Sequence, residues 1–338
     1  MGFERVAIIG ANRISVSLAL ALKAQAGPPE IVGSDADPAL ARKARSMGAF
    51  DRQEHRADQV CRDADLVIVS TPLSAVRETF AAIAPHLQPG CLVTDTASLK
   101  TPVLRWAAEL LPENVSFVGG HVIPNPAIVG FEQPEGLDDA SADLLKNALY
   151  CLTTSPQTSG VAVNRLVALA GALEAQPLLI DATEHDGLQA GIEGLPDLLA
   201  VALLRATVDT PGWREMRKFA DLRFAVATHN AADAHERHGD LYLNRENVLL
   251  RLDGLLNELI RLRNLLADGD AEALAGTFAA AAEERGRWIA EREQGMWVKE
   301  LGIADTSHLP SPGDRFLQML FGSTAGRRGR KPGRSPDR

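Results

Sequence analysis

The stretch RVAIIGANRIS, residues 5–15, joins a short apolar run to a glycine turn and the start of an Ala/Leu-rich helical pattern. A strand, a tight turn and a helix in this order are typical of the first unit of a dinucleotide-binding domain, whose fingerprint is G-x-G-x-x-G. The first glycine makes the turn, the second lets the backbone approach the pyrophosphate, and the third allows close helix–strand packing. Gly10 supplies the first of these, whereas Asn12 and Ser15 stand at the other two positions.

The two replacements have different expected consequences. Asn tolerates a left-handed backbone better than most residues, so the turn can form at Asn12, but its side chain enters the space of the pyrophosphate. Ser15 is small enough for close packing. Arg13 and Ile14 lie between them, and Arg13 either reaches a phosphate or faces solvent. We therefore place Gly10, Asn12, Arg13 and Ile14 in a predicted cofactor site.

An acidic residue follows the second apolar run. Asp35 comes 25 residues after Gly10 (35 − 10), about where an acid holds the ribose hydroxyls of a dinucleotide. An acid at this point disfavours a 2′-phosphate, so we expect NAD rather than NADP. Asp37 is a rival for this role, or it caps the helix that begins at Pro38.

Seven short apolar runs alternate with helical patterns through the first half of the chain. They are rich in Val, Ile and Leu, as expected of strands buried on both faces of a parallel sheet. Repeated strand–helix units predict an α/β, Rossmann-type doubly wound sheet over residues 1–182. One run ends in Ser70-Thr71-Pro72, at the carboxyl edge where such sheets bind ligands, so these residues join the cofactor site. The expected strands are 5–9, 30–34, 66–70, 91–95, 116–119, 149–153 and 177–181, and the expected helices are 14–25, 38–46, 73–84 and 101–110.

The strand pattern stops near Glu184, and the remainder predicts an all-α domain over 183–298. In one segment Leu249, Leu252, Leu256 and Leu259 recur at spacings of three and four, which makes an apolar surface wider than a single stripe. Such a helix either packs inside one subunit or contacts a partner subunit. The expected helices are 186–208, 214–237, 241–267 and 270–293.

The overall composition bounds the class of protein. Of 338 residues, 46% are apolar and 23% charged, as in an ordinary globular protein, and the formal net charge is −9. That charge argues against a nucleic-acid-binding surface, although local Arg placement still permits a small anionic substrate. We see no signal segment and no apolar run near the roughly 18 residues that span a bilayer, so we expect a cytoplasmic protein without membrane contact. The cysteines Cys61, Cys91 and Cys151 are far apart, which predicts neither metal binding nor a disulfide.

Residues 299–338 are expected to form a tail. From about 322 onward it is rich in Gly, Ser and Pro and holds six basic residues and one acid, so we expect it to be disordered. Its basic run faintly resembles a minor-groove-binding arm, and the alternative is a solvated tail.

Eight segments follow one another in a recognisable order and spacing. They are VAIIGANRISVSLALALK (6–23), IVGSDADP (31–38), DADLVIVSTPLSAVRE (63–78), LVTDTASLK (92–100), FVGGH (117–121), DATEHDGLQAGIEGLPDLLAVAL (181–203), GWREMRKFA (212–220) and NRENVLLRLDGLLNEL (244–259). Together they resemble the prephenate/arogenate dehydrogenase family, and the last three resemble its helical dimerisation domain. The resemblance spans roughly residues 5–290 and implies a homodimer. It also implies an enzyme of tyrosine and aromatic amino acid biosynthesis.

The resemblance implies a reaction and catalytic residues. In that family NAD takes a hydride from C4 of a cyclohexadienol acid, with loss of CO₂ and aromatisation. His121 matches the neutral family histidine that accepts the proton of the C4 hydroxyl, a task that suits a pKa near working pH. Ser98 matches the serine that orients the same hydroxyl, and it can also cap the helix near Pro102. A lone His is otherwise often structural.

Two further matches concern the substrate. Arg217 falls on the family arginine that holds a substrate carboxylate, which a guanidinium binds through two parallel hydrogen bonds. Its neighbours Arg214 and Lys218 are either alternatives or solvated residues. His185 matches a position at the start of the helical domain, where a structural or interdomain role competes with catalysis.

Three segments depart from the family pattern. Where the family has Ser-His-Leu-Pro-His, this chain has Glu193-Gly194-Leu195-Pro196-Asp197, so an acid replaces a pocket histidine. After His121 the Pro-Met-Ala-Gly of the family is absent, and the third departure is the pair Asn12 and Ser15. We include Asp197 in the substrate site, although an acid suits arogenate, with its ammonium group, better than the dicarboxylate prephenate.

Two classes of function stay open at this point. One is an active NAD-dependent dehydrogenase with degenerate site motifs that acts on prephenate, arogenate or a related cyclic acid. The other is a non-catalytic homologue that keeps the fold and the dimer as a binding or regulatory protein. A different oxidoreductase on the same fold, such as a β-hydroxyacid or imine reductase relative, is a third possibility.

Overall fold

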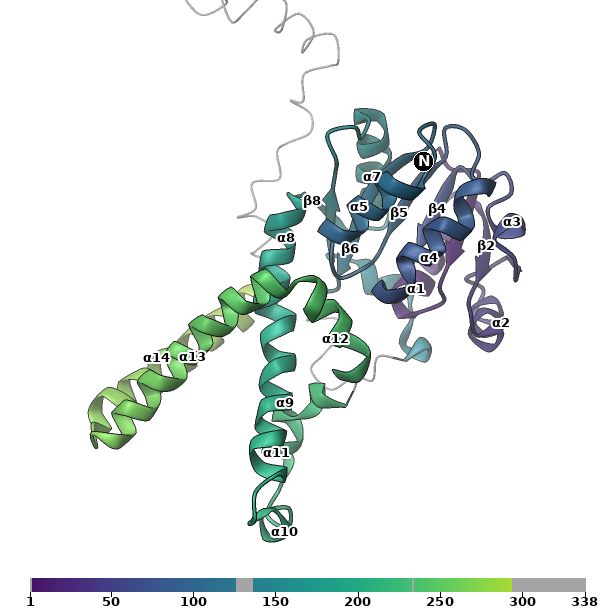
Figure 1. The fold of residues 1–338 in the computed structure, drawn as a ribbon. Helices are drawn as coiled ribbons and strands as arrows, with labels where there is room; N and C mark the ends of the chain where they lie inside the picture. The colour runs from purple at the N-terminus through teal and green to yellow at the C-terminus, as the bar shows by residue number, and fades with distance from the viewer. Residues whose placement is uncertain (1, 126–135, 233, 294–338) are drawn as a thin grey trace, which may run out of the picture. The chain divides into compact units, whose positions relative to one another are not determined.

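The computed structural model describes residues 2–125, 136–232 and 234–293 (Figure 1). Its N-terminal half is an eight-stranded sheet in the order β3-β2-β1-β4-β5-β6-β7-β8. Strands β1 to β6 pair in parallel, β7 is antiparallel to β6, and β8 is parallel to β7. The strands are β1 (Arg5–Ile9), β2 (Glu30–Ser34), β3 (Arg52–Gln53), β4 (Leu66–Val69), β5 (Leu92–Asp95), β6 (Ser116–Ile123), β7 (Leu149–Thr153) and β8 (Gln176–Leu179).

Helices cover both faces of the sheet, each over its own apolar cluster. Alternate residues of β1 point to opposite faces, so Val6 and Ile8 join one cluster and Ala7 joins the other. The first cluster packs under α1 (Arg13–Lys23), α2 (Pro38–Ser46) and α7 (Gly160–Ala172), and the second under α3 (Ala57–Val60), α4 (Leu73–Ile83) and α5 (Thr101–Leu110). This confirms the predicted Rossmann-type doubly wound sheet.

Two features of the sheet differ from the prediction. β3 was not expected, because its two residues Arg52 and Gln53 are polar and carry no apolar signal at this sheet edge. β6 runs through Ile123 rather than ending at 119, because its second half pairs with β7 after its first half has paired with β5. His121 therefore lies within β6, opposite Cys151, and not in the loop beyond it.

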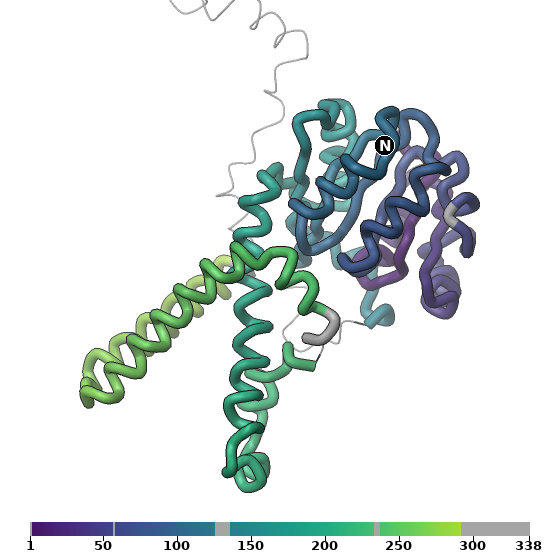
Figure 2. Tube along the Cα trace, viewed as in Figure 1, coloured from purple at the N-terminus to yellow at the C-terminus, as the bar shows by residue number. Residues whose placement is uncertain are grey.

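The helical half begins where β8 leads into α8 (Figure 2). Its helices are α8 (Ala182–Gln189), α9 (Leu195–Val208), α10 (Trp213–Met216), α11 (Leu222–Ala227), α12 (Ala234–Leu243), α13 (Arg245–Ala267) and α14 (Ala271–Glu293). The single helix expected over 214–237 is wrong, because the chain turns there and Asp221 starts a new helix by accepting a hydrogen bond from the Arg223 N–H.

A π turn over Ala190–Gly194 joins α8 to α9. It ends two residues before Pro196, whose ring has no N–H and would collide with the carbonyl four residues earlier in a regular helix. The wider turn relieves that collision, and π turns are frequent at functional sites.

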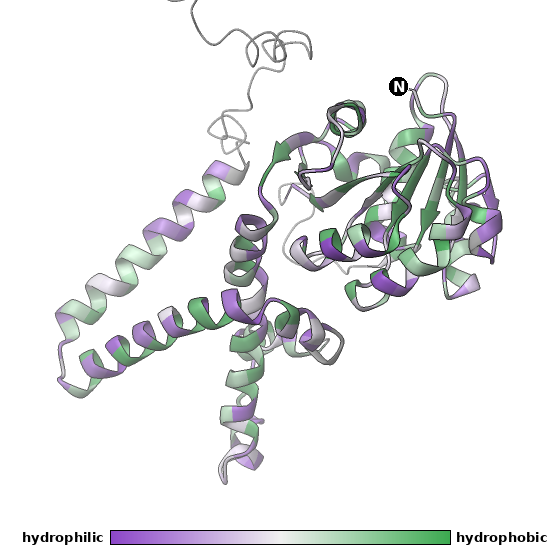
Figure 3. Cartoon of the chain, turned by 45° about the horizontal axis from the view of Figure 1, so that its top comes forward, coloured by the Kyte–Doolittle hydropathy of each residue, from purple (hydrophilic) through white to green (hydrophobic). Residues whose placement is uncertain are grey.

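The helical half leaves much of its apolar surface uncovered. On α13, Leu249 and Ile260 are both 55% exposed. Figure 3 shows apolar and polar residues interspersed along these helices, in contrast to the mostly apolar central strands of the sheet. An apolar helix face of this extent needs a second surface to cover it.

One helical stretch, Ala182–Val208, is long and apolar enough to cross a membrane by length and composition alone, with a mean hydropathy of 1.3. We had expected no such stretch. A helix that packs on protein passes the same test, and here the buried carboxylates Asp186 and Asp197 bond to other segments of the chain. These polar groups are matched to protein rather than to lipid.

Candidate functional site

The turn after β1 depends on glycine at one position. Gly10 has φ +100°, and a Cβ there would lie 2.2 Å from the carbonyl oxygen of Ser70, the residue that follows β4. No other residue fits, because both the backbone conformation and the close approach exclude a side chain. Asn12 has φ −113° and ψ 177°, so its tolerance of the left-handed backbone is not used.

The Asn12 side chain bonds within the chain. Its Oδ1 accepts from the Ser15 N–H at 3.0 Å, and its Nδ2 donates to the Ser70 carbonyl at 2.8 Å and to Ser70 Oγ at 2.9 Å. Ser70 Oγ is in turn 2.7 Å from Thr96 Oγ1. This network ties together the carboxyl ends of β1, β4 and β5, and Asn12 caps α1.

The other groups at this edge suit a dinucleotide. In the first turn of α1 the N–H groups of Arg13 and Ile14 precede the helical ladder, so they are free to meet a phosphate. Asp35 lies half-buried at the end of β2, where its carboxylate accepts from the backbone of Ala11 and Asp37 at 2.7 Å each. Asp37, the alternative to Asp35 in the sequence analysis, caps α2 by accepting from the Ala39 N–H. The two hydrogen bonds from Ala11 and Asp37 fix the Asp35 carboxylate at the carboxyl edge of the sheet.

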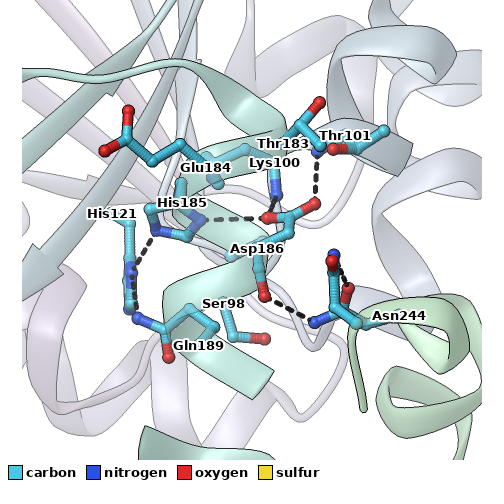
Figure 4. Close-up of polar contacts among 12 residues, drawn as sticks. Ser98, Lys100, Thr101, His121, Thr183, Glu184, His185, Asp186, Gln189 and Asn244 are labelled. Carbon is cyan, nitrogen blue, oxygen red and sulfur yellow. Dashed lines mark hydrogen bonds and ion pairs between the residues drawn. The ribbon is translucent and has the colours of Figure 1, made fainter. Parts of the chain in front are cut away.

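His121 is the first of three side chains joined by hydrogen bonds (Figure 4). His121 Nδ1 is 3.0 Å from His185 Nε2, and His185 Nδ1 is 3.0 Å from Asp186 Oδ1. Asp186 also accepts from the N–H groups of Lys100 at 2.7 Å and Thr101 at 2.9 Å. Burial acts to raise the pKa of Asp186, but these hydrogen bonds outweigh it and hold the pKa below its usual value. Asp186 is therefore an ionised acceptor.

The ionised carboxylate decides where the imidazole protons lie. Because Asp186 accepts, His185 carries its proton on Nδ1 and presents a lone pair at Nε2. His121 must then donate from Nδ1, which leaves its own Nε2 as a lone pair. Gln189 Nε2 lies 3.3 Å from the same Nδ1, and two donors cannot bond, so a half-turn of the amide brings the otherwise unpaired Oε1 to that position.

A buried ion pair lies next to His121. Lys100 Nζ donates to Asp95 Oδ2 and to the Gly120 carbonyl, both at 2.5 Å, and both charged side chains are fully buried. Asp95 Oδ1 accepts from the Gly120 N–H at 3.0 Å, so the pair clamps the residue that precedes His121 from both sides. Burial, with the nearby Lys100 charge and His185, holds the pKa of His121 well below its ordinary value. His121 is thus kept neutral.

Ser98 lines a pocket whose other lining residues come mostly from the helical half. Its cavity volume is about 40 Å³, and it opens to solvent. Ser98 Oγ donates to Asp240 Oδ2 at 3.3 Å, and burial raises the pKa of Asp240. Gln189 lines the pocket and also contacts His121, so it joins the two parts of the site. The remaining lining residues are Leu99, Ala190, Glu193, Gly194, Asp197, Arg237, Leu241, Asn244 and Val248.

Asp197 is a buried member of this pocket. Its Oδ1 accepts from Arg237 at 2.7 Å and from Asn230 Nδ2 at 3.0 Å. Burial raises its pKa, and these two partners partly offset the rise. Arg217 lies elsewhere, exposed at the carboxyl end of α10, and it is not among the residues that line the pocket.

The structure therefore gathers His121, Ser98 and Asp197 in one region and leaves Arg217 outside it within this chain. It adds residues that the sequence analysis did not select, namely Asp186, Gln189, Lys100, Asp95, Arg237 and Asp240. The signal for Asp186 was its place beside His185 in a motif already quoted. Arg237 and Asp240 carried no signal, because the predicted helices 214–237 and 241–267 put Arg237 at the end of a helix and Asp240 in the connection between two helices, whereas both lie on α12.

Two family models match successive parts of the chain. The model for the nucleotide-binding domain of prephenate dehydrogenase matches residues 18–177, and that for the dimerization domain of prephenate dehydrogenase matches 181–280. The chain belongs to the prephenate dehydrogenase family. The resemblance seen in the sequence is thereby confirmed, and the first half is a nucleotide-binding domain.

The individual relatives are distant. A prephenate dehydrogenase of Bacillus subtilis is 27% identical over 83% of this chain and 75% of its own length, and a cyclohexadienyl dehydrogenase of Zymomonas mobilis is 26% identical over 84% and 95%. Among solved structures, a prephenate dehydrogenase of Aquifex aeolicus in complex with hydroxyphenyl propionate and NAD+ superposes with a TM-score of 0.74 at 22% identity, covering 85% of this chain and 99% of that one. An arogenate dehydrogenase of Synechocystis gives 0.67 at 22%, covering 84% and 99%. These structures support the shared fold.

Proposed function

We propose that this chain is an NAD-dependent dehydrogenase that oxidises and decarboxylates a cyclohexadienol carboxylic acid, prephenate or arogenate. The observation that carries the proposal is the chain Asp186–His185–His121, which leaves the Nε2 of a buried, neutral histidine as a proton acceptor. A histidine held in this tautomer by a carboxylate is suited to general-base chemistry.

The proton and electron transfers follow from that tautomer. Bound NAD supplies the acceptor for the hydride that leaves C4. As that hydride departs, His121 Nε2 takes the proton of the C4 hydroxyl and a carbonyl forms. The carboxylate on C1 then leaves as CO₂, its bonding electrons enter the ring, and the C4 oxygen recovers a proton from His121. Ser98 holds the oxygen that changes from hydroxyl to carbonyl.

NAD is the proposed nucleotide for three reasons in the chain itself. Gly10 permits the close turn, the first-turn N–H groups of Arg13 and Ile14 suit a pyrophosphate, and the carboxylate of Asp35 suits free ribose hydroxyls and repels a 2′-phosphate. Ser70, Thr71 and Pro72 follow β4 at the same edge of the sheet.

The charge of the pocket bears on the choice of substrate. Asp197 and Asp240 line it, and the cation Arg237 pairs with Asp197. The Asp240 carboxylate favours a substrate that carries an ammonium group, so we expect arogenate to be preferred over prephenate.

The uncovered helix faces support a homodimer. The family's dimerisation domain spans residues that include α9 and α13, on which Leu199, Leu203, Leu249, Leu256 and Leu259 are exposed in the single chain. Burial of such side chains contributes about 1.5–3 kcal/mol each. We expect a second copy to cover them.

One assay tests the proposal. NADH formation is measured with prephenate and with arogenate, alongside calorimetric titration of the protein with NAD. Turnover of either acid supports the enzyme, and arogenate is expected to give the higher kcat/KM. Absence of NAD binding at millimolar concentration contradicts it.

A non-catalytic homologue is the second candidate, and one observation favours it. Asn12 already occupies the Ser15 N–H at the head of α1, where a pyrophosphate would bind. NAD binding without turnover of either substrate would support this candidate or another substrate.

A further inference from the structure

Arg237 is a cation of the Ser98 pocket that the family resemblance does not assign. It lies on α12, three residues before Asp240, and lines the same pocket as Ser98. One terminal nitrogen donates to Asp197 Oδ1 at 2.7 Å. Its Nε is buried and has no hydrogen-bond partner among the described residues. A guanidinium has five donors, so this side chain has capacity left for an anion.

Asp197 fixes the position of that guanidinium. Its side chain is only 5% exposed and is held by Asn230, whereas the Arg237 side chain is 41% exposed. The buried carboxylate thus anchors one terminal nitrogen of the fork, while part of the side chain stays accessible. A planar fork held at one end is preorganised for a second carboxylate, because little side-chain freedom is left to lose.

We infer that Arg237, anchored by Asp197, binds a carboxylate of the substrate. The identity of that substrate rests on the proposed function, but the anion-binding role rests on this geometry. The acid that replaces a family histidine at 197 then does not repel an anionic substrate, since its charge is matched by Arg237. An ammonium group on the same ligand has Asp240 to pair with.

Arg217 is the rival residue. It ends α10, is exposed, and does not line the pocket in this chain. The two arginines therefore make opposite predictions for matched substitutions to leucine.

The test measures steady-state kinetics with arogenate and prephenate, and calorimetric binding of hydroxyphenyl propionate, for the full-length protein. Arg237→Leu is expected to raise KM and the Kd of hydroxyphenyl propionate roughly 10- to 100-fold, with kcat changed only a few-fold. Arg237→Lys should recover part of the loss, because it keeps the charge without the fork. Arg77→Leu, at an exposed pair with Glu109 on the sheet half, is the neutral control.

Arg237→Leu leaves Asp197 buried without its cation, so unfolding must be separated from loss of binding. Arg237→Gln keeps a donor for Asp197 and removes the charge, and it should show the same rise in KM with an unchanged thermal midpoint. A KM within twofold of wild type for the folded Gln variant overturns the inference. So does a rise in KM for Arg217→Leu with none for Arg237→Gln.

The outcomes separate the inference from the proposed function. If the wild type turns over neither acid but binds hydroxyphenyl propionate in an Arg237-dependent way, the enzyme proposal fails and the inference stands. If the wild type turns over either acid and substitution of Arg237 changes nothing, the enzyme proposal stands and the inference about Arg237 fails. If the wild type binds none of the three compounds, both the enzyme proposal and the inference about Arg237 are overturned.

Discussion

In the sheet half of the chain, strands β4 and β5 are entirely buried, whereas in the helical half α13 leaves Leu256 and Leu259 each 46% exposed. The charged groups differ in their burial. Buried Lys100 pairs with Asp95 and the Gly120 carbonyl, while Arg237 on α12 pairs with Asp197 at the pocket and stays partly exposed. The sheet half buries its apolar side chains within one chain, and the helical half leaves apolar surface that a second copy can cover.

The largest expected effect is on the free energy of unfolding, and it follows when the buried ion pair of the sheet half is broken. Lys100→Met leaves the Asp95 carboxylate buried without its cation, which should lower the free energy of unfolding by about 3–5 kcal/mol. Thermal and denaturant unfolding measure it. Lys43→Met removes a lysine of an exposed pair with Asp138 and should change stability by less than about 1 kcal/mol. Equal effects of the two variants would mean that the buried pair has no special role.

The next effect concerns the helical half. Leu256→Glu places a charge on the exposed face of α13, and we expect the dimer to dissociate by about two orders of magnitude more readily, since one leucine contributes about 1.5–3 kcal/mol. Analytical ultracentrifugation over a concentration series measures this. The sheet half should keep its far-ultraviolet signal. A variant that stays dimeric at micromolar concentration would show that α13 is not the covered face.

The pH dependence tests the site where the halves meet. Burial lowers the pKa of His121 from 6.5, so the neutral base persists as the pH falls through that value. We expect the acid limb of the kcat profile below pH 6.5. Stability should also decline as the pH falls below about 6.5, because the unfolded chain then gains a proton that the folded chain does not. An acid limb at or above 6.5 contradicts this account of His121.

The smallest effect concerns the turn at α1. Asn12→Gly removes the cap and the bonds to Ser70, which should cost about 1 kcal/mol of stability. It also frees the Ser15 N–H, so we expect NAD to bind more tightly. Calorimetry and thermal unfolding measure both. Unchanged NAD affinity would mean that the capped turn already holds the phosphates in another way.

Sequence predicted the sheet half closely because its signals are local. Val, Ile and Leu runs mark strands, and Gly10 and Asp35 mark their ends. β3 was not predicted, because a two-residue edge strand of Arg52 and Gln53 forms through its pairing with β2 and has no apolar pattern of its own. The extension of β6 was not predicted, because it depends on antiparallel pairing with β7, which is distant in the sequence.

The candidate site was only partly predictable. His121, Ser98 and His185 stand in motifs that the resemblance carries. The tautomer of His121 depends on His185 and Asp186, and Asp186 is held by backbone N–H groups at the start of α5, where α8 packs against that helix. The place of Arg237 at the pocket depends on the break in the chain before α12. The periodicity of apolar residues does not locate such a break. Predictions for 299–338 lie outside the described residues.

The central claim is that a neutral His121 serves NAD-dependent oxidation of a cyclohexadienol acid. The most direct measurement is NADH formation from arogenate and prephenate by the wild type and by His121→Asn, with hydroxyphenyl propionate binding as the check on an intact pocket. We predict turnover by the wild type and a loss of about 10²- to 10⁴-fold in kcat for the variant, with binding retained. Turnover that survives the substitution unchanged would contradict the account.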